Sequence, residues 1–226
     1  ELHYLSNSDP ELGFALLSDF RDAPEKHMAG DDALIEEAVQ GIEALNRKYA
    51  GRTFGPFFIF HRERKWNESE QVWMGWERKR GKLEEFNAYL LGEDRNAFAV
   101  QRGNLEFIDG VRYVVTLDAD TVLPRDAARR LIGTLAHPLN RAVFDELGRA
   151  VSGYTVLQPR TELRPTGTER SLFSRVFGAD LGLDLYTRAV SDVYQDLFGE
   201  AIFVGKGIYD VEAFYRSLEG RVPENA

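Results

Sequence analysis

The chain has 226 residues, enough for one large domain with a full hydrophobic core, and its 43% hydrophobic and 29% charged residues are ordinary for a globular protein. A net charge of −9 argues against nonspecific nucleic-acid binding as its main activity, and the lack of cysteine excludes disulfides and thiolate chemistry. No stretch reaches the apolar length that a transmembrane helix needs. We therefore predict a single domain over residues 1–226 that binds no nucleic acid and does not span a membrane.

The first part of the chain predicts two strands joined by a helix. Residues 13–18 form a short apolar run next to a glycine, which is typical of a strand. Apolar residues recur at helical spacing over 31–49, and the apolar run 57–61 predicts a second strand. A strand, a helix and a strand in this length predict a parallel pair with a right-handed crossover. Asp19 and Asp22 follow the first strand, where they fit a solvated loop or a loop that faces a nucleotide.

A basic and aromatic segment follows the second strand. Residues 62–80 contain several lysines and arginines together with Trp66, Trp73 and Trp76. A solvated charged run is the usual explanation for such a segment, but exposed tryptophans usually stack on something. Residues 79–82 then form a basic turn with a glycine at the start of a predicted helix. A turn of this kind suits a diphosphate, because backbone N–H groups at a helix start attract anions.

The centre of the sequence is the segment 113–123, which reads YVVTLDADTVL. Its aromatic and β-branched start predicts a buried parallel strand. Asp118 and Asp120 follow at the end of this strand, where ligands bind in α/β sheets. Two carboxylates this close repel each other unless a cation or a proton lies between them, and a hard divalent ion is the expected neutraliser.

The last part of the chain predicts further short elements. Helices are expected over 125–137, 172–177 and 185–198, strands over 152–158 and 202–204, and a final helix capped by Asp210 that ends at Leu218. A Gly205-Lys206-Gly207 turn follows the second of these strands.

Together, these motifs resemble the nucleotide-sugar glycosyltransferases of GT-A fold, and in particular the glycosyltransferase domain of cyclic β-1,2-glucan synthases. The similarity is carried by LLSDFRDAPE, ERKRGKLEEFN, YVVTLDADTVLPRDAARRLIGTLAHPLN, GYTVLQPR and SDVYQDLFGEAIFVGKGIYDVEAF. It implies an α/β, GT-A-like fold, with a mostly parallel central sheet flanked by helices and a truncated C-terminus.

The resemblance also implies a reaction. UDP-glucose would be the donor and β-1,2-linked glucan the product, with inversion at the anomeric carbon. Asp118 and Asp120 match the motif that binds the metal–diphosphate, with Mg²⁺ or Mn²⁺ as the cofactor. The other matching positions are Asp19 and Asp22 on the uridine side, Lys82 near the diphosphate, and Gly205, Lys206 and Gly207 on the acceptor side.

The catalytic base is not assigned by the resemblance within the chain. An inverting transferase needs a carboxylate to accept the proton of the acceptor hydroxyl, and we expect that residue beyond Ala226. Asp192, Asp196 and Glu200 are candidates within the chain. We therefore expect a piece of a larger protein at the cytoplasmic face of a bacterial inner membrane, which has the glucan acceptor and other domains of the same polypeptide as partners and is inactive when isolated.

Two other interpretations are open. The DADTV segment also fits the opening motif of haloacid-dehalogenase phosphatases, with Asp118 as the nucleophile and Asp120 as the acid/base. That fold normally has this strand near its start, whereas here a hundred residues precede it. The second alternative is a non-catalytic glucan-binding module, in which the three tryptophans would stack on sugar rings.

Overall fold

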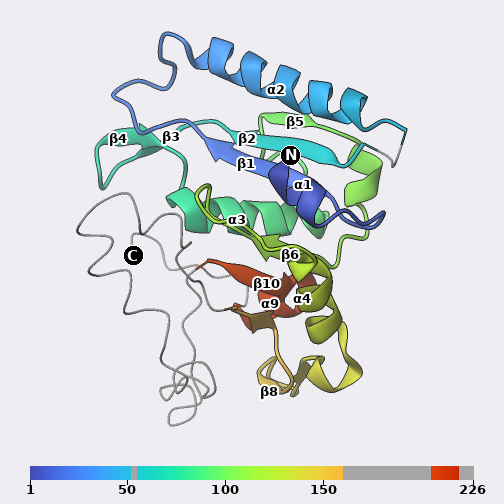
Figure 1. The fold of residues 1–226 in the computed structure, drawn as a ribbon. Helices are drawn as coiled ribbons and strands as arrows, with labels where there is room; N and C mark the ends of the chain where they lie inside the picture. The colour runs from blue at the N-terminus through green and yellow to red at the C-terminus, as the bar shows by residue number, and fades with distance from the viewer. Residues whose placement is uncertain (52–54, 160–204, 219–226) are drawn as a thin grey trace, which may run out of the picture. The chain divides into compact units, whose positions relative to one another are not determined.

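The computed structural model describes residues 1–51, 55–159 and 205–218 (Figure 1). The chain divides into two compact units, residues 1–157 with 207–226 and residues 158–206. All helices and strands discussed below lie in the first unit. The predicted helices over 172–177 and 185–198 and the predicted strand over 202–204 lie outside the described residues.

The first sheet contains the predicted parallel pair. Strands β1 (Phe14–Asp19) and β2 (Phe57–Arg62) run parallel, and helix α2 (Asp31–Lys48) connects them. Strand β5 (Val100–Arg102) pairs with β2 in the antiparallel direction. The strand–helix–strand prediction for this part of the chain is therefore confirmed.

Strand β2 is buried along its whole length and has a different helix on each face. Phe57 and Ile59 pack in a cluster with residues of α2 and with Tyr4 from helix α1 (Leu2–Ser6). On the opposite face, Phe60 contacts Phe86 and Tyr89 of helix α3 (Arg78–Leu90). Figure 1 shows α2 and α3 on the two sides of this sheet. The alternation of side chains along a strand explains this arrangement, because successive residues point to opposite faces.

The second sheet is antiparallel. Strand β10 (Gly207–Asp210) pairs with β6 (Tyr113–Thr116) on one side and with β9 (Val156–Leu157) on the other. The prediction of a buried parallel strand at 113–116 is therefore wrong in direction, and three of its four residues are only partly buried. A short apolar run is compatible with parallel and with antiparallel pairing. The direction of β6 is set by its partner β10, which lies about ninety residues further along the chain.

The expectation of a mostly parallel central sheet is also wrong for the described strands. Only β1 and β2 pair in parallel there, and the other strand pairs within sheets are antiparallel. The described part of the chain is a mixed α/β structure built from small sheets and helices. Its remaining elements are β3 (Lys65–Asn67), β4 (Val72–Met74), η1 (Leu105–Ile108), α4 (Ala127–Ala136), η2 (Pro138–Asn140), β7 (Val143–Phe144), β8 (Ala150–Ser152) and α9 (Val211–Ser217).

Helix α3 contacts both three-stranded sheets. Its aromatic residues pack on β2, and the buried hydroxyl of Tyr209 in β10 donates a 2.7 Å hydrogen bond to Asn87 Oδ1 of the helix. The N-terminus of α9 is capped as predicted, because Asp210 Oδ1 accepts a hydrogen bond from the backbone N–H of Ala213. Among the described residues, no helix combines the length and the apolar character needed to cross a bilayer.

Candidate functional site

The candidate site starts at a buried ion pair between the ends of two parallel strands. Asp19 ends β1 and Arg62 ends β2, and the two residues are direct partners in the strand register. Arg62 Nε lies 2.6 Å from Asp19 Oδ1, and the Arg62 side chain is only 2% exposed. Arg62 Nη1 also contacts Glu85 Oε2 of α3, at 2.7 Å. Two carboxylates therefore contact one buried guanidinium. A buried charge has to be paired and hydrogen-bonded, and Arg62 meets this requirement.

The same guanidinium holds the chain that leads into α3. Arg62 Nη1 donates to the carbonyl of Trp76 at 3.0 Å, and Arg62 Nη2 donates to the carbonyl of Arg78 at 2.9 Å. Between these carbonyls, Glu77 and Arg78 both have left-handed backbone angles, with φ of 48° and 47°. Two consecutive non-glycine residues rarely adopt this conformation, so the Arg62 bonds stabilise a strained entry to the helix.

The first turns of α3 bring together three of the acidic residues that the sequence indicated. Arg78 Nη2 lies 3.0 Å from Asp22 Oδ2, and Lys82 Nζ lies 2.7 Å from Asp19 Oδ2. Lys79 forms an ion pair with Asp118, which follows β6. These three ion pairs all involve the first turns of α3, and together they connect the carboxyl end of β1 with the carboxyl end of β6.

The predicted turn over 79–82 is wrong, because α3 begins at Arg78, and Gly81 and Lys82 lie inside the helix.

The glycines around this helix start are explained by packing. A Cβ added to Gly81 would lie 2.2 Å from the carbonyl oxygen of Trp76. A Cβ added to Gly75 would lie 2.8 Å from Asp19 Cγ. Both glycines therefore allow close approach of the backbone to the ion-pair cluster.

Asp118 and Asp120 lie on the segment directly after β6. The carbonyl of Asp118 accepts a 3.0 Å hydrogen bond from the N–H of Thr121, which closes a turn. Asp118 is partly buried, whereas Asp120 is exposed and lies 3.4 Å from the Thr121 hydroxyl. In residues 1–51, 55–159 and 205–218, no group of three or more His, Asp or Glu side chains is arranged to hold a metal ion.

The electrostatics of the cluster favour a charged Asp19 and a neutral His61. Burial by itself would raise the pKa of Asp19, but hydrogen bonds from Arg62 and Lys82 outweigh it and hold that pKa below its usual value. His61 precedes Arg62 on β2, and burial lowers the pKa of its imidazole. Its Nδ1 is 3.0 Å from the Ser18 hydroxyl, while the buried Nε2 has no hydrogen-bond partner among the described residues.

The predicted acceptor-side turn is divided between the two units. Gly205 and Lys206 belong to the second unit, and Gly207 begins β10 of the first. The carbonyl of Gly207 is 3.4 Å from the Thr116 hydroxyl of β6. The three candidate bases, Asp192, Asp196 and Glu200, lie outside the described residues.

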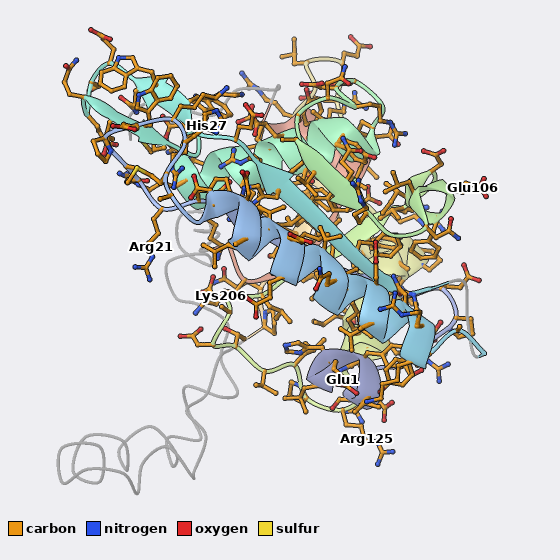
Figure 2. All side chains as sticks on the ribbon, turned by 90° about the horizontal axis from the view of Figure 1, so that it is seen from above. Glu1, Arg21, His27, Glu106, Arg125 and Lys206 are labelled. Carbon is orange, nitrogen blue, oxygen red and sulfur yellow. The ribbon has the colours of Figure 1, made fainter. Side chains whose placement is uncertain are left out.

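Three residues of the cluster have no role in the sequence-based prediction. Arg62 and Arg78 lie in the basic segment and Glu85 lies in the helix that follows it, but no local pattern indicates their partners. Lys79 lies in the 79–82 segment predicted to suit a diphosphate, but its pairing with Asp118 was not predicted. The available signal for Arg62 was a basic residue two positions after the apolar run 57–60, because the backbone of a buried strand carries such a side chain into the protein. Arg62 is buried, whereas Arg21, on the loop after β1, projects away from the ribbon (Figure 2).

The fold and this cluster describe an α/β protein with carboxylates and cations gathered at two strand ends. No family model matches the chain. Over 228 aligned residues, which include all of this chain, it is 48% identical to the cyclic beta-(1,2)-glucan synthase NdvB of Rhizobium meliloti (strain 1021). The chain spans 8% of the length of that relative. It is therefore homologous to a segment of a cyclic β-(1,2)-glucan synthase, which confirms the resemblance seen in the sequence and does not favour the phosphatase interpretation.

Proposed function

We propose that this chain is the donor-binding part of a UDP-glucose-dependent, inverting glucosyltransferase of GT-A-like fold that makes β-1,2-glucan. The observation that carries the proposal is the start of α3, where Arg78, Lys79 and Lys82 each contact a carboxylate from one of two strand ends. The name of the relative NdvB supports glucan as the product.

The cations of α3 are the groups that would bind the diphosphate. Lys82 is held by Asp19 with 18% of its side chain exposed, and Lys79 is 42% exposed beside Asp118. Both ammonium groups project from the first turns of a helix, where the helix dipole also favours negative charge. A diphosphate at this position would share these cations with the carboxylates, and it would receive charge-assisted hydrogen bonds as UDP leaves.

Asp118 and Asp120 have the chemistry of a site for Mg²⁺ or Mn²⁺. Both supply hard carboxylate oxygens, and Mg²⁺ in particular is usually bound by one or two carboxylates with substrate phosphates and waters completing its shell. The ion pair of Asp118 with the ammonium of Lys79 supports this proposal, because the carboxylate already has a cationic partner. When bound there, the ion would offset the negative charge of the leaving UDP.

In the proposed reaction, the acceptor hydroxyl attacks the anomeric carbon of glucose while the bond from that carbon to the UDP oxygen breaks. The proton of the hydroxyl passes to a carboxylate base, for which Asp192, Asp196 and Glu200 are the candidates in this chain. The residues of the donor site act on the leaving group. Arg62 is a positioning residue, because it fixes both Asp19 and the entry to α3.

Calorimetric titration of the chain with UDP and with uridine tests the role of Lys82. We expect Lys82→Ala to weaken UDP binding roughly 10- to 100-fold, since a hydrogen bond to a charged group contributes about 1.5–3 kcal/mol. Uridine affinity should be unchanged. Lys48→Ala is the matched control, because Lys48 pairs with Glu1 at the far end of α2 from Arg21 (Figure 2). Equal losses for UDP and uridine would show that Lys82 does not contact the diphosphate.

A further inference from the structure

The β3–β4 hairpin carries a cavity that the donor site does not use. The cavity has a volume of about 460 Å³ and is lined by Trp66, Met74 and Trp76 together with polar side chains, which are Lys65, Asn67, Glu68, Ser69 and Glu77. This volume lies in the range of small-molecule sites, which are typically about 300–1,000 Å³.

Trp66 is the most exposed aromatic residue of this cavity. Trp66 is 43% exposed, although it packs against Trp73, its partner across the hairpin, at a ring centroid distance of 5.8 Å. Trp66 Nε1 donates a 2.6 Å hydrogen bond to Glu68 Oε2, which fixes the orientation of the indole. An indole that is oriented and supported but still exposed offers a flat apolar surface for a ligand.

The hairpin is held firmly to the loop that follows β1. The backbone of Trp73 exchanges two 2.9 Å hydrogen bonds with Ala23, and Arg78 bridges Glu70 of the hairpin turn to Asp22. Asn67 Oδ1 accepts a hydrogen bond from the N–H of Glu70 and so stabilises the turn itself. The cavity is therefore preorganised, which reduces the entropy lost when a ligand binds.

We propose that this cavity is a subsite for the glucan chain, a proposal that rests on the glucosyltransferase function. A β-linked glucose residue has equatorial hydroxyls, so both faces of its ring carry C–H groups that can stack on Trp66. The lining contains one lysine and two glutamates, so it offers both charged donors and charged acceptors to the hydroxyls of a sugar. Asn67, Glu68 and Ser69 provide acceptors and donors for its hydroxyls.

The position of the cavity suits a glucan chain that serves as the acceptor or is the product. Trp76 and Glu77 line it, and the carbonyl of Trp76 is bound by Arg62, the residue that also holds Asp19. The cavity and the donor cluster thus share the segment at the entry to α3. A glucan held on Trp66 would remain beside the donor site between transfers.

The experiment is a titration of the chain with linear β-1,2-gluco-oligosaccharides, without nucleotide, followed by tryptophan fluorescence and calorimetry. We expect saturable binding that Trp66→Ala weakens roughly tenfold or more, as is usual for a central aromatic contact. Trp66→Tyr should keep most of the affinity. Tyr154→Ala is the matched control, because Tyr154 is a similarly exposed aromatic residue, at 48%, on the segment between β8 and β9.

Three outcomes would overturn the proposal. They are the absence of saccharide binding by a chain that circular dichroism shows to be folded, unchanged affinity in Trp66→Ala, and preference for tetramethylammonium over the saccharide. UDP titration of the same sample separates this failure from failure of the donor site, since each ligand is measured without the other.

Discussion

Arg62 and Asp19 face each other across the ends of β2 and β1, with 2.6 Å between Arg62 Nε and Asp19 Oδ1. The same guanidinium reaches Glu85 and two carbonyls at the entry to α3. The parallel register of β1 and β2 therefore places the buried guanidinium of Arg62 where it contacts both Asp19 of the proposed donor site and the start of α3, the helix that carries Lys82.

Replacing Arg62 should strongly destabilise the fold. Arg62→Met leaves Asp19 and Glu85 without their buried partner, and breaking a buried pair in this way typically costs about 3–5 kcal/mol. Urea unfolding followed by circular dichroism measures the loss. Arg95→Met is the control, because Arg95 pairs with Asp109 at the surface, where such a pair contributes about 1 kcal/mol or less. Similar losses for the two variants would contradict a central role for Arg62.

Removing Lys79 should change the affinity for a divalent ion. Lys79 pairs with Asp118, so its ammonium and a metal ion would compete for the same carboxylate. We expect Lys79→Met to strengthen Mn²⁺ binding about fivefold in the absence of nucleotide, which corresponds to about 1 kcal/mol of removed repulsion. Calorimetry with Mn²⁺ provides the measurement. Unchanged or weaker Mn²⁺ binding would place the ion elsewhere.

Stability should depend on pH through His61. Burial lowers its pKa below the ordinary value of 6.5, so between the lowered pKa and 6.5 the unfolded chain binds a proton that the folded chain does not. Stability contributed by a neutral His61 is therefore complete above 6.5 and decreases as the pH falls through this window. We expect His61→Gln to flatten the dependence of the urea midpoint on pH between about 7.5 and 5.5.

The control for this prediction is His27→Gln, which replaces an exposed histidine on the loop before α2 (Figure 2). This variant should keep the pH dependence of the original chain. If His27→Gln flattens the profile and His61→Gln does not, the buried imidazole is not the titrating group.

The contact between α3 and the second sheet should be measurable as stability. Tyr209→Phe removes the buried hydroxyl that donates to Asn87, and leaving a buried acceptor without its donor costs about 1–3 kcal/mol. Tyr215→Phe is the matched control, because its hydroxyl contacts Glu93 at the surface. Comparable urea midpoints for Tyr209→Phe and Tyr215→Phe would show that this bond does not hold α3 in place.

Local patterns in the sequence predicted the first strand–helix–strand unit well. Apolar runs at 13–18 and 57–61 and helical spacing over 31–49 correspond closely to β1, β2 and α2, because each pattern depends on neighbouring residues alone. The antiparallel direction of β6 could not be predicted in this way. It depends on pairing with β10, which local residue patterns do not encode.

In the candidate site, too, local features could be predicted and long-range contacts could not. Acidic residues at strand ends could be selected from the sequence, because their positions relative to the strands are local features. Their partners could not, since the contacts of Arg62 with Asp19 and Glu85 join residues separated by 43 and 23 positions. In the sequence, a run of basic residues indicates a solvated surface, and only the fold reveals that one of them, Arg62, is buried.

The most direct test of the proposed function is the binding of UDP-glucose with Mn²⁺ and with EDTA, measured by calorimetry on the original chain and on Asp118→Asn and Asp120→Asn. The proposed donor site requires binding that depends on the metal and that both variants weaken by roughly tenfold or more, as the loss of a charged ligand group should. Tyr154→Ala should bind as the original chain does. Equal affinity in Mn²⁺ and EDTA, or unchanged affinity in both aspartate variants, would contradict a metal–diphosphate site at Asp118 and Asp120.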